Sequence, residues 1–422
     1  MSKSSDLLST PAVASGGAAV AVARSVPPYS DLSPKERLES VLANLPRLLK
    51  SNVLPFYKPK PRSKTSGGMH YKQPKAVGHK NPNSQYDRPL YSRPFFAGKK
   101  DYSGSNFIDI MFGNVMEYLL PGSTAKTRVG EAKGQSFFFS KEIPDFLSYE
   151  EMQKRGKDFR GKHSHQVMVR FLATAMFLGD ADPNRKNFGI ELSPSGNKTF
   201  RRIDLELAGN YNACVSLIVR DRFEVFIETK NYFRMLLLRS IEYSGGMCLE
   251  AQVIVSADFA LAVGNLEKVN LEHVREILTE SFKALIDFIG PEIIKKYSVS
   301  DKLKAEKWML EQLNDELFGL NPIASIDLTI SSWVDRVITE MRLRLRQLKI
   351  WSDLINFSLH EGVDRTNIKD RIDSASVEGD GELVAELKLL FIDLYKKAKG
   401  VREGLIISDG VGGVVYLLKK IA

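Results

Sequence analysis

The chain lacks the residues and patterns on which several common protein classes depend. Only two of its 422 residues are cysteines, Cys214 and Cys248, which excludes a disulfide framework and a four-cysteine zinc site. No run of 18 apolar residues occurs, so no transmembrane helix is expected. The six histidines show no metal-binding spacing, and no G-x-S-x-G serine, zinc-finger or RNP motif is found. What remains is an ordinary globular composition, 43% hydrophobic and 26% charged.

The charge balance favours an anionic partner. Lysine and arginine number 60 against 51 acidic residues, a formal net charge of +9. Such a balance suits nucleotides, acidic membrane surfaces or nucleic acid, and it does not choose among them. Because no nucleic-acid-binding module is present, we expect no nucleic-acid partner.

Periodicity and turn residues outline the organisation of the chain. Residues 1–32 are rich in Ser, Ala, Gly and Pro and are expected to form a disordered tail. Ser33-Pro34-Lys35-Glu36 predicts a helix start with a capping box, followed by a basic linker to residue 59. Residues beyond about 215 are expected to be mostly helical. The individual segments expected are a helix at 106–120, strands at 124–130 and 135–141, a helix at 164–178, a hairpin at 188–192 and 199–205, a helix at 271–289 ending at Gly290-Pro291, and a helix at 331–357.

Three oxygen-bearing side chains carry the chemistry. Asn187 lies five positions after Asp182, the spacing of the catalytic Asp and the metal-binding Asn in the kinase loop H-R-D-x-x-x-x-N. The predicted hairpin then brings Asp204 alongside. Phosphoryl transfer needs a base for the attacking hydroxyl and oxygen ligands for Mg²⁺. The pattern therefore predicts ATP and Mg²⁺ as cofactors, with Asp182 as the base and Asn187 and Asp204 as metal ligands.

Two other interpretations of the same loop stay open. Asp180, Asp182, Asn184 and Glu191 occupy positions 1, 3, 5 and 12 of a calcium-binding EF-hand pattern, although the position that normally holds Gly is an Arg. The loop is also compatible with an Asx-rich turn that caps a helix without any ligand.

The string GDADPNRKN…RRIDLE resembles the catalytic loop and metal-binding motif of atypical kinases. These include HipA-like kinases, actin-fragmin kinase and type II phosphatidylinositol 4-kinases. The most similar group is the LepB-type phosphoinositide-kinase domain of effectors that intracellular bacteria inject into host cells. The resemblance covers about residues 60–215. It implies an α+β, bilobal, atypical protein-kinase-like fold, with a β-rich N-lobe at 60–148, a helical C-lobe at 149–300 and a helical C-terminal extension at 301–422.

The resemblance also implies where the nucleotide is held. In NFIDIMFGNVMEYLLPGS (106–123), one acidic residue takes the place of the glutamate that pairs with the phosphate-binding lysine. FFAGKK (95–100) resembles the strand that carries that lysine, with the first of its two lysines slightly preferred. A Ser-Lys pair on the next strand and a glycine pair at a loop tip complete the nucleotide site. The implied nucleotide-binding residues are Asp109, Lys99, Lys100, Lys141, Gly67 and Gly68.

The substrate implied by the resemblance is a phosphoinositide on an anionic membrane surface. The protein would then be a secreted bacterial effector in the host cytoplasm, peripherally bound to membranes, and its C-terminal helices could bind a host protein. Two departures from the family pattern, Asn184 in place of His and Glu206 in place of Gly, leave a catalytically dead pseudokinase scaffold open. A HipA-like Ser/Thr protein kinase stays open as well, because the same catalytic residues serve protein acceptors.

Overall fold

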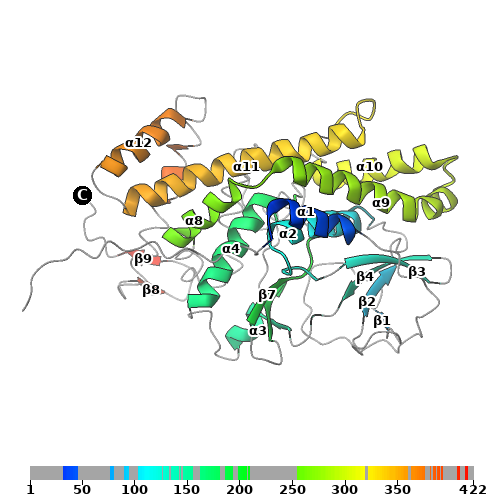
Figure 1. Cartoon of the computed structure of the whole chain (residues 1–422), viewed down its shortest axis with the longest axis horizontal. Helices are drawn as coiled ribbons and strands as arrows, with labels where there is room; N and C mark the ends of the chain where they lie inside the picture. The colour runs from blue at the N-terminus through cyan, green and yellow to red at the C-terminus, as the bar shows by residue number, and fades with distance from the viewer. Residues whose placement is uncertain are drawn as a thin grey trace, which may run out of the picture.

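The computed structural model combines many helices with three small antiparallel sheets, so the fold is of the α+β class. Figure 1 shows long helices in a layer along one side of the molecule and the strands on the other. The structure describes residues 32–45, 77–79, 90–94, 103–125, 127–132, 135–141, 143, 146–154, 162–180, 186–192, 198–206, 208–209, 254–318, 322–359, 363–375, 381, 384–385, 387–389, 391–392, 406–408 and 414–416. Of the expected disordered tail and basic linker, residues 1–31 and 46–59 lie outside this set.

Helix α1 (Pro34–Ala43) begins at the predicted capping box. The Glu36 N–H donates to Ser33 Oγ (3.2 Å), and the Ser33 N–H donates to Glu36 Oε2 (2.7 Å). These two hydrogen bonds between near neighbours fix the start of the helix, as the sequence predicted. Its Arg37 Nη1 donates to the carbonyl of Tyr118 (3.1 Å), which ties α1 to the end of helix α2.

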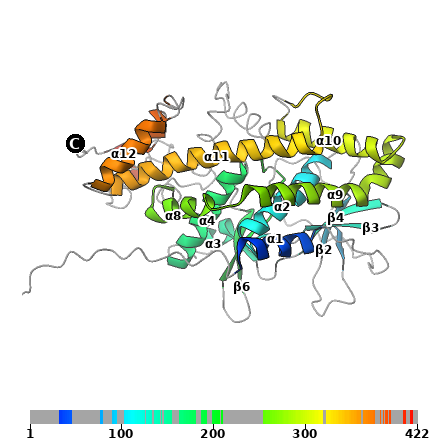
Figure 2. The same cartoon turned by 45° about the horizontal axis from the view of Figure 1, so that its top comes forward.

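Helix α2 (Ser103–Leu119) confirms the helix predicted at 106–120 and runs through the interior. Most of its side chains are buried because it packs against α1, α9 and α10 and against strand β3. Figure 2, which turns the view, shows α2 crossing α9, one of the helices that it contacts. Its buried apolar side chains are Phe107, Ile108, Ile110, Met111, Phe112, Val115, Met116, Tyr118 and Leu119.

The first sheet has four strands in the order β1-β2-β4-β3, all antiparallel. Its strands are β1 (Val77–His79), β2 (Leu90–Pro94), β3 (Thr127–Ala132) and β4 (Gln135–Lys141). The predicted strand at 124–130 begins three residues later, because Thr124 instead forms an isolated parallel bridge with Arg202. The bridge at Thr124 thus links the segment after α2 to Arg202, which belongs to the second sheet.

The second sheet has three strands in the order β5-β6-β7, and helices α3 and α4 lie beside it. Its elements are β5 (Phe146–Ser148), α3 (Tyr149–Lys154), α4 (Lys162–Leu178), β6 (Phe188–Leu192) and β7 (Lys198–Arg202). Helix α4 and the β6–β7 hairpin confirm the predicted segments, except that β7 ends before residue 203. Stacked rings join both helices to the hairpin, with the ring centroids of Phe171 on α4 and Tyr149 on α3 lying 4.5 Å and 5.3 Å from that of Phe188.

Helices α8 to α11 form the long layer. They are α8 (Ala257–Leu266), α9 (Leu271–Tyr297), α10 (Lys302–Phe318) and α11 (Ile330–Leu359). The predicted end of a helix at Gly290-Pro291 was wrong, because α9 continues through both residues. An internal proline costs a helix about 3 kcal/mol. Here Pro291 is exposed, whereas Ile286, Ile289 and Ile293 continue the buried stripe, and tertiary burial outweighs the local penalty.

Helix α12 (Val363–Ala375) packs against α11. The described residues beyond 215 are mostly helical, as expected, and the exceptions are the short strands β8 (Ile406–Ser408) and β9 (Val414–Tyr416), which pair. β-branched residues dominate both short segments and favour strands. Within the described part of the chain, no helix combines the length and hydrophobicity needed to cross a membrane.

Candidate active site around the β6–β7 hairpin

The end of helix α4 turns the chain into the loop that contains Asp182. Gly179 adopts a left-handed conformation (φ +69°), and its N–H donates to the Met176 carbonyl (3.2 Å). The next N–H, of Asp180, donates to the Ala175 carbonyl (2.8 Å). This pair of bonds is the Schellman motif, which ends a helix sharply at a glycine. Asp182 itself, in residues 181–185, lies outside the described set.

The C-terminal helices also hold the end of α4. The guanidinium of Arg344, on α11, is 2% exposed, and its Nε donates to the Phe177 carbonyl (2.8 Å). A cation at the last carbonyls of a helix satisfies a free acceptor and complements the helix dipole. Helix α11 therefore holds the last turn of α4, directly before the loop that contains Asp182.

A buried ion pair joins the first residue after that turn to the end of β7. Arg202 Nη2 and Nε lie 2.7 Å and 3.1 Å from Asp180 Oδ2, and both side chains are almost fully buried. The guanidinium carbon also lies 5.8 Å from the centre of the Phe171 ring. A buried charge is stable only when it is paired and hydrogen-bonded. This pair fixes the start of the loop against the hairpin.

The backbone of Arg202 is bonded to the segment after α2. Its N–H donates to the Ser123 carbonyl (2.6 Å), and its carbonyl accepts from the Ala125 N–H (3.1 Å). The turn itself is held by Glu117, whose carboxylate accepts from the Gly122 N–H (2.7 Å) and from Thr124 Oγ1 (2.9 Å). One residue thus connects α2, α4 and the hairpin.

The two expected metal ligands lie at the same end of the hairpin. The register pairs Phe188 with Arg202, and the next bond runs from the Ile203 N–H to the Asn187 carbonyl (2.7 Å). Asn187 therefore immediately precedes β6, and Asp204 is the residue directly after Ile203. Asn187 is partly exposed and Asp204 is exposed, so both can be reached from solvent.

The backbone of Asp204 is left-handed, with φ +65°. Such a conformation is unfavourable for most L-residues, is tolerated better by Asp and Asn, and recurs at functional sites. Directly after it, the Leu205 N–H donates to Oδ1 of Asp109 on α2 (3.1 Å), and both residues are buried. The chain then returns to the end of α4, where the Gly209 N–H donates to the Gly179 carbonyl (2.8 Å).

The chemistry of these donors fits a magnesium ion that also binds phosphate oxygens. Asn187 offers an amide oxygen and Asp204 a carboxylate, and Mg²⁺ usually takes only one or two protein carboxylates besides phosphate oxygens and water. Within the described ranges, no three His, Cys, Asp or Glu side chains lie close enough to hold a metal ion by themselves. The calcium interpretation finds two of its four ligands engaged by arginines, since Glu191 accepts from Arg201 Nε (2.7 Å) and Asp180 accepts from Arg202.

The remaining predicted residues are only partly placed. Lys141 is the last residue of β4, opposite Leu90 in the sheet. The other predicted nucleotide-binding residues outside the described set are Lys99, Lys100, Gly67 and Gly68.

Sequence reasoning missed the structural role of Arg202 and Asp180. The consecutive arginines 201 and 202 did carry a signal, because alternate residues of a strand point to opposite faces. One of the two had to face the core, where an arginine requires an acidic partner. The nearby Asp180 was considered only as a calcium ligand.

Comparisons with known proteins add little. No family model matches the chain, and no curated protein matches it. Among solved structures, the Helicobacter pylori proinflammatory kinase CtkA aligns over 63% of this chain and 94% of its own. It is 9% identical, with a TM-score of 0.32. A TM-score this low carries no argument, so a functional assignment depends on the residues and their geometry.

Proposed function

We propose that the protein is an ATP- and Mg²⁺-dependent kinase whose active site lies at the end of the β6–β7 hairpin. The observation that supports the proposal is the hydrogen bond from the Ile203 N–H to the Asn187 carbonyl (2.7 Å), which holds Asn187 next to the residue that precedes Asp204. The loop that contains Asp182 starts at the same place, because Asp180 is bonded to Arg202. Base and metal ligands of a phosphoryl-transfer site would thus converge.

In this proposal the acceptor hydroxyl oxygen attacks the γ-phosphorus of ATP. Asp182 takes the hydroxyl proton, the bond to the β-phosphate oxygen breaks, and ADP leaves. Asn187 and Asp204 would hold Mg²⁺, which would supply neutralisation of the phosphate charge when bound, and Lys99 or Lys100 would contact the phosphates as well. The smaller lobe would comprise α2 and the sheet β1–β4, with Lys141 and the Gly67-Gly68 loop at the nucleotide. Fixed charges of this kind supply most of the rate enhancement in such sites.

A phosphoinositide is the acceptor that we infer. The likeness of GDADPNRKN…RRIDLE to lipid-kinase loops and the net charge of +9 support it. From the same likeness and the same net charge we infer a secreted effector that works on host membranes. A Ser/Thr protein kinase would use the same residues, so the acceptor has to be settled by experiment.

Nucleotide binding is the first expectation to test. ATP with Mg²⁺ should stabilise the folded chain by about 2.7 kcal/mol at a hundred times its dissociation constant, seen as a raised melting temperature. Asp204→Ala should lose the part of this shift that depends on Mg²⁺. A wild-type chain that shows no shift with ATP would support a pseudokinase scaffold instead.

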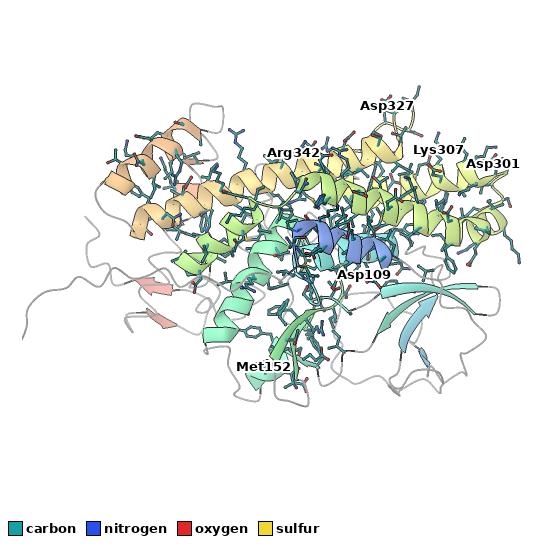
Figure 3. The ribbon with its side chains drawn as sticks, in the orientation of Figure 1. Asp109, Met152, Asp301, Lys307, Asp327 and Arg342 are labelled. Atoms are coloured by element: carbon teal, nitrogen blue, oxygen red, sulfur yellow. The ribbon has the colours of Figure 1, made fainter. Side chains whose placement is uncertain are left out.

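Turnover distinguishes the acceptors. We expect phosphate transfer from radiolabelled ATP to phosphoinositide vesicles but not to a panel of protein substrates, and Asp182→Ala should slow it about 10²- to 10⁴-fold. Asp327→Ala is the matched control, because Asp327 is exposed on a loop at the outer edge of the helical layer (Figure 3). Transfer to protein and not to lipid would replace the lipid kinase with a protein kinase.

A further inference from the structure

Asp109 lies against the backbone that follows Asp204. Its carboxylate is 5% exposed on α2, and Oδ1 accepts the Leu205 N–H at 3.1 Å. Figure 3 labels it near the middle of the molecule, between the long helices and the strands. The sequence predicted only that this residue would pair with a lysine. The bond to Leu205 is a separate and specific contact between residues 96 positions apart.

This bond acts on the orientation of Asp204. The Leu205 N–H belongs to the same planar peptide unit as the Asp204 carbonyl, so an acceptor that holds the N–H also fixes that plane. Asp204 is exposed and left-handed, whereas Leu205 and Glu206 are buried. An unfavourable backbone conformation persists only when its surroundings enforce it. Asp109 supplies a side-chain contact at this point.

Helix α2, which carries Asp109, is itself held in place by contacts with α9 and α10. Asn114 Nδ2 donates to Ser281 Oγ on α9 (2.9 Å), and Ser105 Oγ donates to Glu316 Oε1 on α10 (3.3 Å). At Gly104 the backbones are so close that an added Cβ would lie 3.2 Å from the Gln312 carbonyl oxygen. The helical layer thus sets where α2, and with it Asp109, can be.

We propose that Asp109 is a positioning residue that aims Asp204 at the divalent ion through its hydrogen bond to the Leu205 N–H. This inference rests on the proposed function for the identity of the ion. The effect depends on an acceptor oxygen at Oδ1 rather than on negative charge. Asparagine keeps such an oxygen at the same length, and alanine does not, which separates the hydrogen bond from a charge pair with a lysine.

Kinetics against Mg²⁺ concentration test the positioning role. Asp109→Ala should raise the Mg²⁺ concentration that gives half-maximal rate by about tenfold or more, since a buried N–H loses its acceptor. Asp109→Asn should rescue most of that change. A merely structural defect would lower the rate equally at every Mg²⁺ concentration. Equal losses in the two variants would overturn the proposal in favour of charge pairing.

Hydrogen exchange at the Leu205 amide, measured on the full chain without nucleotide, gives a readout that needs no activity. The amide should be protected in wild type and in Asp109→Asn, and it should exchange at least about tenfold faster in Asp109→Ala. If the alanine variant does not fold, the asparagine variant decides alone, and loss of protection there overturns the proposal. Protection in the expected pattern with an inactive wild type would refute the kinase assignment and leave the contact standing.

Discussion

Replacing Arg202 with methionine is expected to lower the free energy of unfolding by about 3–5 kcal/mol, the usual cost of breaking a buried ion pair. The substitution keeps a long apolar side chain against Phe171 and removes the cation from Asp180. Both partners of the pair are essentially inaccessible to solvent, with exposed side-chain fractions of 0% and 1%. The carboxylate would then be buried without its arginine. Urea unfolding, with the midpoint compared at constant m-value, measures the loss.

The adjacent arginine supplies a matched control. Arg201 pairs with Glu191 on the more solvent-exposed face of the hairpin, where the two side chains are 22% and 18% exposed. Arg201→Met should therefore cost about 1 kcal/mol or less. In the double variant Arg202→Met/Asp180→Asn the buried charge is gone, and part of the lost stability should return. Equal costs at positions 201 and 202, or no recovery in the double variant, would contradict the role assigned to the pair.

Replacing Gly189 with alanine is expected to lower the free energy of unfolding by about 3 kcal/mol or more, because overpacking against backbone cannot be relieved by a rotamer change. A Cβ at this position would lie 2.0 Å from the Leu147 carbonyl oxygen and 2.8 Å from Ser148 Cα. Strand β5 pairs with β6 at this point, with Ser148 opposite Gly189. Strand β6 would have to move away from β5, and Asn187, two residues before Gly189, would be displaced with it. Calorimetry and urea unfolding both measure the effect.

Gly264→Ala is also a glycine-to-alanine substitution, but it is expected to raise the free energy of unfolding. Gly264 lies within α8, and an added Cβ there would meet nothing within 4 Å. Alanine is favoured over glycine in a helix by about 0.5–1 kcal/mol, so this variant should be slightly more stable than wild type. A Gly189→Ala variant as stable as Gly264→Ala would show that β5 does not pack on β6 as described.

Several elements of the fold were predictable because their signals are local. The capping box fixed the start of α1 at Pro34, and apolar periodicity gave α2 and α4 to within three residues at each end. Turn chemistry gave the hairpin, whose strands begin directly after Asn187 and end two residues before Asp204. Each signal spans fewer than about 20 residues.

Local signals misled where distant contacts decided the outcome. Gly290-Pro291 normally ends a helix, but α9 continues because the buried stripe does. The partner of Arg202 is 22 residues away, and the residue that Asp109 contacts is 96 away. No periodicity or spacing indicates which side chains meet across such separations.

The sequence by itself determined helices α1, α2 and α4 and the hairpin that follows Asn187 and precedes Asp204, since propensity, capping and turn chemistry act between near neighbours. Only the tertiary structure decided that Arg202 neutralises Asp180, that Asp109 bonds beside Asp204 and that Asp204 is left-handed. The physical reason is burial. Once packing removes water from a charge or an N–H, that group must find a partner wherever the fold brings one within reach.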